Sequence, residues 1–97
     1  MKYQLHPEAA LEHEEQVAYY EARASGLGGR YHAEFKSVVS RICETPDHYM
    51  LVSPPDTRRS SLKGFPFSII FRESGGAIQI LAVAHHRRRP RYWAARL

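Results

Sequence analysis

Cysteine is almost absent from this sequence, because Cys43 is the only one among its 97 residues. A single thiol excludes an internal disulfide and is typical of proteins from a reducing compartment, so we expect a cytoplasmic protein. Long apolar runs are also lacking, and we therefore expect neither a membrane-spanning segment nor a membrane as partner. Residues 1–5 lead directly into charged sequence, which predicts that no signal peptide is present.

Acidic residues are scarce in the second half of the chain. Residues 50–97 contain two acidic and nine basic residues, whereas residues 1–49 contain eight acidic and five basic ones. The two halves therefore carry net charges of +7 and −3, which together make the +4 of the whole chain. This asymmetry favours a polyanionic partner, either nucleic acid or an acidic protein segment. At this length we expect a single domain over residues 1–97.

Spacings that would bind a metal or a cofactor are lacking as well. One cysteine offers no thiolate cluster, and the histidines before residue 50 do not form a convergent set of ligands. The glycines within residues 26–29 do not form a phosphate loop, since no strand precedes them and no Lys-Ser/Thr pair follows. We therefore expect no metal and no cofactor. The histidines in question are His6, His13, His32 and His48.

The spacing of apolar residues predicts two helices and four strands. Helical periodicity covers Glu8 to about Ala24 and, after a glycine-rich link, Gly28 or Gly29 to Glu44. Residues 47–56 are expected to form an irregular connector. The predicted strands are Lys2–Leu5, Thr57–Lys63, Phe67–Arg72 and Ile78–Ala84, the last two joined by a tight hairpin at residues 74–76.

The resulting order, β-α-α-β-β-β, predicts an α+β fold. A helical hairpin should pack on one side of a small, mainly antiparallel sheet, because its apolar stripe needs a second layer. Alternation along a strand sends successive side chains to opposite faces of the sheet. The face under the helices should contain Phe67, Ile69 and Phe71, and the other face Ile70, Leu81 and Val83.

The last predicted strand ends in a basic and aromatic cluster, His-His-Arg-Arg-Arg-Pro-Arg-Tyr-Trp, at residues 85–93. Because unpaired charges are costly to bury, this cluster should lie at the surface, at the end of a buried strand. His85 and His86 should point to opposite sides, so that only one of them faces the arginines. Two interpretations of Trp93 are open, a core residue that covers the sheet or a binding anchor. The arginines could also pair with glutamates of the first helix.

Several short motifs occur in a characteristic order. They are Tyr19-Tyr20, Gly-Leu-Gly at 26–28, Phe35, Pro46, Arg59 to Leu62 with Phe65-Pro66-Phe67, and the terminal cluster. Together they resemble the RelE/ParE superfamily of bacterial toxins from type II toxin–antitoxin systems, and the ParE members more closely. The resemblance covers almost the whole chain. It implies the same α+β fold, a cognate antitoxin with an acidic or amphipathic segment, and a role in plasmid stabilisation.

ParE-like toxins poison DNA gyrase, so the resemblance implies that this chain is a gyrase inhibitor. Such an inhibitor needs a surface that binds its target rather than the catalytic residues of an enzyme. Arginine and aromatic residues are favoured anchors of protein interfaces. Eight of the nine basic residues in the second half of this chain are arginine, and five of these lie between Arg87 and Arg96. The expected target- or antitoxin-binding residues are Arg58, Arg59, Lys63, Arg72, Arg87, Arg88, Arg89, Arg91, Tyr92 and Trp93.

RelE-like members instead cut mRNA on the ribosome without a metal, and such an endoribonuclease is the alternative function. In that case His85 or His86 would be the acid or base. Arg87 would stabilise charge on the phosphate, and Tyr92 would be a second acid. However, Ser68 stands where these nucleases carry a strand arginine, and a serine cannot supply that charge. A non-toxic nucleic-acid-binding module is the third possibility.

Overall fold

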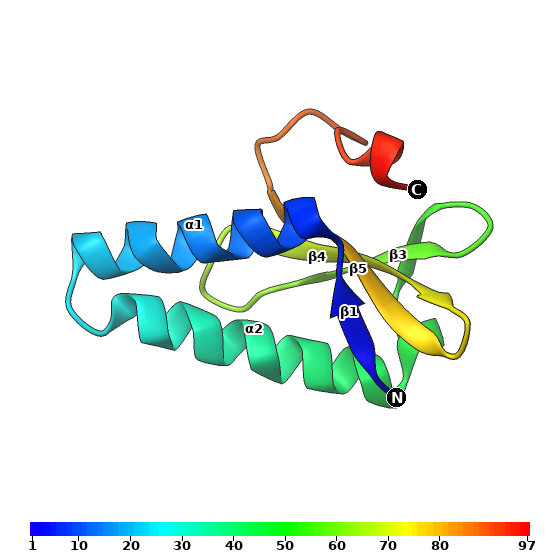
Figure 1. The fold of residues 1–97 in the computed structure, drawn as a ribbon, viewed down its shortest axis with the longest axis horizontal. Coiled ribbons are helices and arrows are strands. Elements are labelled where there is room, and N and C mark those ends of the chain that lie inside the picture. Colours follow the sequence, from blue (N-terminus) through cyan, green and yellow to red (C-terminus); the bar gives the residue numbers. More distant parts are fainter.

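The computed structural model describes residues 1–97 as two helices packed on one face of a five-stranded sheet (Figure 1). The strand order is β1-β5-β4-β3-β2, in which β1 runs parallel to β5 and all other neighbours are antiparallel. The predicted α+β fold is therefore confirmed, with one strand more than expected. The elements are β1 (Tyr3–Leu5), α1 (Pro7–Arg23), α2 (Leu27–Glu44), η1 (Pro46–His48), β2 (Met50–Ser53), β3 (Thr57–Ser61), β4 (Phe67–Ser74), β5 (Ala77–His85) and η2 (Ala94–Arg96).

Helices α1 and α2 form an antiparallel hairpin that projects beyond the sheet (Figure 1). The Glu21 carboxylate accepts hydrogen bonds from the backbone N–H groups of Gly26 at 2.9 Å and Gly28 at 3.0 Å. These bonds satisfy N–H groups that have no partner within α2. A Cβ atom at Gly28 would lie 2.5 Å from the carbonyl oxygen of Val17, so the close approach of the helices requires glycine there. No helix is long and apolar enough to cross a membrane.

The main hydrophobic core lies between the helical hairpin and the inner face of the sheet. Helix α2 buries one stripe of side chains, as its periodicity predicts, and β4 buries alternate residues beneath it. Four aromatic rings meet in edge-to-face contacts at one end of this core, where Tyr20 and Tyr31 pack against Phe65 and Phe67. The core residues from α2 and β4 include Tyr31, Phe35, Val38, Ile42, Phe67, Ile69 and Phe71.

A β-bulge in β5 changes which face its last residues occupy. Ile70 pairs with Ala82, whereas the next residue of β4 pairs with Ile80, so Leu81 is the extra residue. The alternation of β5 is shifted beyond this point. Val83 consequently packs in the main core, and the prediction that it lies on the outer face is wrong. Leu81 and Ile70 do lie together on the outer face, as expected.

The predicted irregular connector at residues 47–56 contains the strand β2, and the prediction is wrong at this point. β2 pairs with β3 and forms one edge of the sheet. It is only four residues long, and Pro54 and Pro55 follow it. The side chains of its first two residues, Met50 and Leu51, are both exposed. Sequence patterns therefore provide neither the alternation nor the length by which strands are recognised.

Candidate functional site

Residues 86–97 form a tail that leaves β5 and folds back over the outer face of the sheet (Figure 1). Trp93 fixes this tail, because its side chain is 4% exposed and packs with Ile70, Leu81 and Ala82. The structure thus shows Trp93 as a core residue that covers the sheet, and little of its ring remains for a partner. The arginines before it, within residues 87–91, are all exposed.

A carboxylate from α1, Glu12, holds the tail against the edge of β5. The Tyr92 hydroxyl donates to Glu12 Oε2 at 2.8 Å, and both terminal nitrogens of Arg96 donate to the carboxylate at 2.9 Å. Glu12 Oε1 also accepts from the Val83 N–H at 3.0 Å, while Arg96 donates to the Leu81 carbonyl at 3.0 Å. These backbone groups lie beyond the end of the β1 pairing. Side chains therefore take the place of a missing strand.

This cluster keeps its charges in a partly dry environment. The Glu12 and Arg96 side chains are 17% and 13% exposed and form an ion pair. Burial raises the pKa of the Glu12 carboxyl, but the hydrogen bonds from Arg96, the Val83 N–H and Tyr92 outweigh it and hold the pKa below its usual value. Burial and the bond to Glu12 raise the pKa of the Tyr92 hydroxyl, which therefore stays a neutral donor. The bond to Glu12 also raises the pKa of Arg96.

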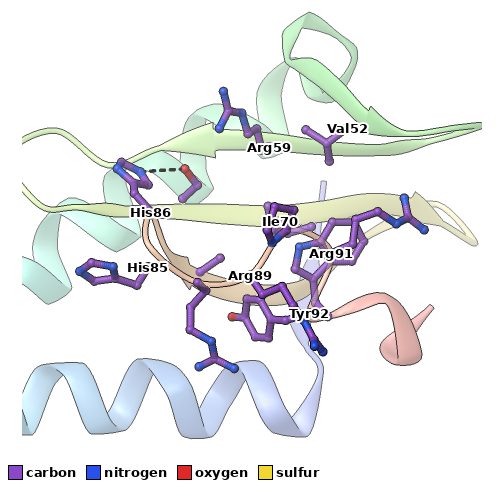
Figure 2. Close-up of a pocket in the computed structure, with 13 residues that line it drawn as sticks. Val52, Arg59, Ile70, His85, His86, Arg89, Arg91 and Tyr92 are labelled. Atoms are coloured by element: carbon purple, nitrogen blue, oxygen red, sulfur yellow. Dashed lines mark hydrogen bonds between the residues drawn. The ribbon is translucent and has the colours of Figure 1, made fainter.

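A cavity of about 280 Å³ lies between the tail and the outer face of the sheet (Figure 2). Four arginines line it, one from β3 and three from the tail, and no aspartate or glutamate does. The Arg88 guanidinium stacks on the Tyr92 ring at 3.9 Å, and Arg91 donates to Ser53 Oγ at 2.6 Å. We call this site the basic cavity. Its lining residues are Val52, Arg59, Ser68, Ile70, residues 84–86 and residues 88–93.

The rings of His85 and His86 point apart (Figure 2), but both residues line the basic cavity, so the prediction that only one of them faces the arginines is wrong. His86 is exposed, and its Nε2 lies 3.1 Å from Ser68 Oγ, which lies 3.0 Å from Ser61 Oγ. His85 instead packs edge-on against Phe67 of the main core, with ring centroids 5.0 Å apart. No group of three or more His, Cys, Asp or Glu side chains lies close enough together to bind a metal ion.

Several of the predicted binding residues lie outside the basic cavity. Arg58 pairs across the strands with a core residue, so it lies on the helix side of the sheet, and it donates to the Tyr49 carbonyl at 2.8 Å. Arg72 donates to the Gln79 side chain at 2.9 Å near the other end of β4. Lys63 is exposed in the link between β3 and β4. The predicted surface therefore consists of the cavity arginines and of separate positions around them.

Of the residues expected for a nuclease, His85, His86 and Tyr92 line the basic cavity, whereas Arg87 does not. Tyr92 donates its hydroxyl to Glu12, and the His85 ring lies against the core. Arg87 is exposed outside the cavity lining, and its backbone N–H donates to His85 Nδ1 at 3.0 Å. Ser68, which stands where an arginine is expected, is 3% exposed. Arg87, the expected charge stabiliser, thus lies outside the cavity, and the Tyr92 hydroxyl and the His85 ring are engaged in contacts within the protein.

Sequence reasoning missed three residues that build the site. Glu12 and Arg96 are 84 residues apart, and no local pattern connects them. Ser53, which accepts the hydrogen bond from Arg91, belongs to the strand that was not predicted. The contact between Glu12 and Arg96 was anticipated only by the alternative that the arginines pair with glutamates of the first helix. The structure shows that pairing for Arg96, outside the run at residues 87–91.

Comparison with protein families finds one match, over residues 3–90, to the family described as the ParE toxin of the type II toxin–antitoxin system parDE. Among solved structures, a chain of the chromosomal ParDE TA system from P. aeruginosa aligns with a TM-score of 0.73 and 22% sequence identity. The alignment covers 88% of this chain and 95% of that chain. At this identity the similarity shows a shared fold. No curated protein matches the chain.

Proposed function

The chain belongs to the family of ParE toxins of type II toxin–antitoxin systems, and from this membership we propose that it inhibits DNA gyrase through its basic tail. A cognate antitoxin neutralises it by covering the same surface. Gyrase acts in the bacterial cytoplasm, which is therefore where the protein works. The proposal requires an exposed surface with high affinity for a partner, and no bond-breaking chemistry by the toxin itself.

The free arginines of the tail are the observation that carries this proposal. Arg87 and Arg89 are exposed and make no side-chain hydrogen bond or ion pair, and the single ion pair of the structure is the one between Glu12 and Arg96. Arginine is among the residues that contribute most to protein interfaces, because its planar fork binds carboxylates with two hydrogen bonds. The tail is also fixed to the sheet through Trp93, so less conformational freedom is lost when a partner binds.

Cleavage of mRNA on the ribosome is the alternative function. The observation that argues against it is the hydrogen bond that the Tyr92 hydroxyl donates to Glu12. A phenol that donates to a carboxylate and whose pKa is raised is poorly placed to protonate a leaving group. Moving it toward a substrate would break the contact that holds the tail.

The test compares the two targets directly with the purified protein. Gyrase, ATP and relaxed plasmid DNA are incubated with the toxin, and supercoiling is followed on agarose gels. A parallel sample contains ribosomes translating a defined mRNA, whose integrity is followed by primer extension. Loss of supercoiling with intact mRNA is the expected result. Cut mRNA with normal supercoiling would overturn the proposal.

A matched pair of variants connects the result to the tail. Arg89→Gln removes a free cation from the tail, whereas Arg30→Gln removes one from an exposed position on α2. We expect the first variant to need about tenfold more protein for the same inhibition, as for loss of an interface arginine. The second should inhibit as the unmodified protein does. Equal inhibition by both variants would show that the tail is not the gyrase-binding surface.

A further inference from the structure

The basic cavity concentrates positive charge in a small volume. Arg59, Arg88, Arg89 and Arg91 line it, no carboxylate does, and its volume of about 280 Å³ is at the small end for ligand cavities. Like charges gathered at one point repel each other, and here no acidic side chain compensates them. This arrangement is typical of a site whose counter-charge is supplied by a ligand.

Two of these arginines are held in place before any ligand arrives. Arg88 lies on the Tyr92 ring at 3.9 Å, and the Tyr92 hydroxyl is itself fixed by Glu12. Arg91 donates to Ser53 at 2.6 Å and adopts a left-handed φ of 62°, a conformation that costs a residue with a side chain roughly 1–2 kcal/mol. The exposed guanidinium groups of Arg59 and Arg89 have no hydrogen-bond partner and are free to close on a bound anion.

The floor of the basic cavity is apolar. It consists of Val52, Ile70 and Ala84, lining residues that come from three different strands of the sheet. A ligand that fills the cavity must therefore present an anionic group to the rim and a flat or apolar group to the floor. A nucleotide has both, because its phosphate binds guanidinium groups and its base stacks on apolar surfaces and on guanidinium planes.

We propose that the basic cavity binds single-stranded nucleic acid, with a phosphate between the arginines and the neighbouring base against the apolar floor. This inference goes beyond the proposed function, which requires only a protein contact with gyrase. A duplex does not fit this site, because its bases are stacked inside and cannot reach the floor. An acidic peptide can pair with the arginines but presents no flat or apolar group to the floor, so we expect it to bind this cavity more weakly than a nucleotide does.

Binding is tested by fluorescence anisotropy with a fluorescein-labelled decathymidylate strand and the full chain, titrated at several salt concentrations. The variant Arg59→Gln/Arg89→Gln removes two cavity cations that have no hydrogen bond in the structure. We expect its dissociation constant to rise at least about tenfold and its salt slope to fall by about 1.4, since each phosphate contact to a single strand contributes about 0.7. Circular dichroism verifies that the variant is folded.

The control is Arg30→Gln, which removes one exposed positive charge from α2, far from the tail in sequence. It should bind the strand as the unmodified protein does; a tenfold loss in this control, or none in the double variant, would overturn the proposal. A decaglutamate peptide is the second probe. If it displaces the labelled strand as well as unlabelled decathymidylate does, the site recognises carboxylates and the proposal is wrong.

Discussion

Glu12 connects helix, sheet edge and tail through one carboxylate. It accepts hydrogen bonds from Tyr92, Arg96 and the Val83 N–H, so its charge is used by three segments at once. Because its pKa is lowered in the folded protein, this charge contributes stability that is present above about pH 4.5, its usual value, and is lost as the pH falls through the lowered pKa. The tail should therefore be the first part of the site to loosen in acid.

Replacing Glu12 by glutamine should release the tail while the rest of the fold persists. Loss of the charge leaves Arg96 without its partner, and we expect opening of this region to become easier by about 2 kcal/mol. The measurement is hydrogen exchange of the Val83 amide, which should become roughly 30-fold faster. Glu15→Gln is the control, because Glu15 is exposed on the same helix and has no hydrogen bond. Unchanged exchange in Glu12→Gln would contradict the role given to the carboxylate.

His13 should make the folded protein sensitive to mild acid. It stacks on Phe35 with ring centroids 3.9 Å apart, and its Nε2 lies 2.9 Å from His32 Nδ1. Burial, and then repulsion from His32, lower its pKa from 6.5 to about 4. Between these values the unfolded chain binds the proton and the folded one does not, so stability falls as the pH drops from 6.5 toward 4. From pH 7 to pH 5 the loss is about 2 kcal/mol.

Urea unfolding at pH 7 and pH 5 measures this loss. The variant His13→Phe keeps an aromatic ring against Phe35 and has no proton to bind, so its stability should change less between the two pH values. His48→Gln, at an exposed position, should behave as the unmodified protein does. If His13→Phe loses as much stability as the unmodified protein, another group is responsible.

At the level of elements, the helical hairpin depends on close contact between backbones. A Cβ atom at Gly28 would meet the Val17 carbonyl oxygen at 2.5 Å and Glu21 Cβ at 2.9 Å. Gly28→Ala should therefore push α2 away from α1 and lower the free energy of unfolding by about 1–3 kcal/mol. Gly29→Ala is a matched control, because nothing lies within 4 Å of its Cβ position. There alanine should stabilise the helix by about 0.5–1 kcal/mol. Equal effects of the two substitutions in denaturant unfolding would contradict this account.

Local patterns predict most elements and miss those that depend on distant partners. The apolar stripe from Tyr31 to Ile42 determines α2, and the alternation of β4 determines its buried face. β2 depends on pairing with β3 and has no pattern of its own. The bulge at Leu81 is also invisible in sequence, because apolar residues on both sides of it suit either face.

At the level of the whole molecule, residues 1–49 carry a net negative charge and residues 50–97 a net positive charge. The tail gathers much of this positive charge at one surface. Exchanging Arg87, Arg88 and Arg89 for glutamate should weaken binding of the cognate antitoxin by about a hundredfold or more. Isothermal calorimetry of the two purified proteins measures this. The same positions changed to lysine keep the charge and should lose much less affinity. Unchanged affinity in the glutamate variant would exclude the tail as an antitoxin contact.

The candidate site could be predicted from the sequence only in part. The run of arginines in residues 87–91 predicted an exposed basic segment, because such charges cannot be buried unpaired, and these arginines are exposed in the structure. How the tail folds back could not be predicted, since it depends on Trp93 entering the outer face and on Glu12 from the far end of the chain. Long-range contacts of this kind appear only when the fold is known.

The side chains that cover the edge of β5 also bear on solubility. Uncovered strand edges offer free N–H and C=O groups to other chains, and this is a common start of aggregation. Glu12 and Arg96 occupy the Val83 N–H and the Leu81 carbonyl, so a second molecule cannot extend the sheet at these positions. A chain whose tail is released would therefore expose an unpaired strand edge as well as lose the surface that we propose binds partners, and we expect it to precipitate in concentrated preparations.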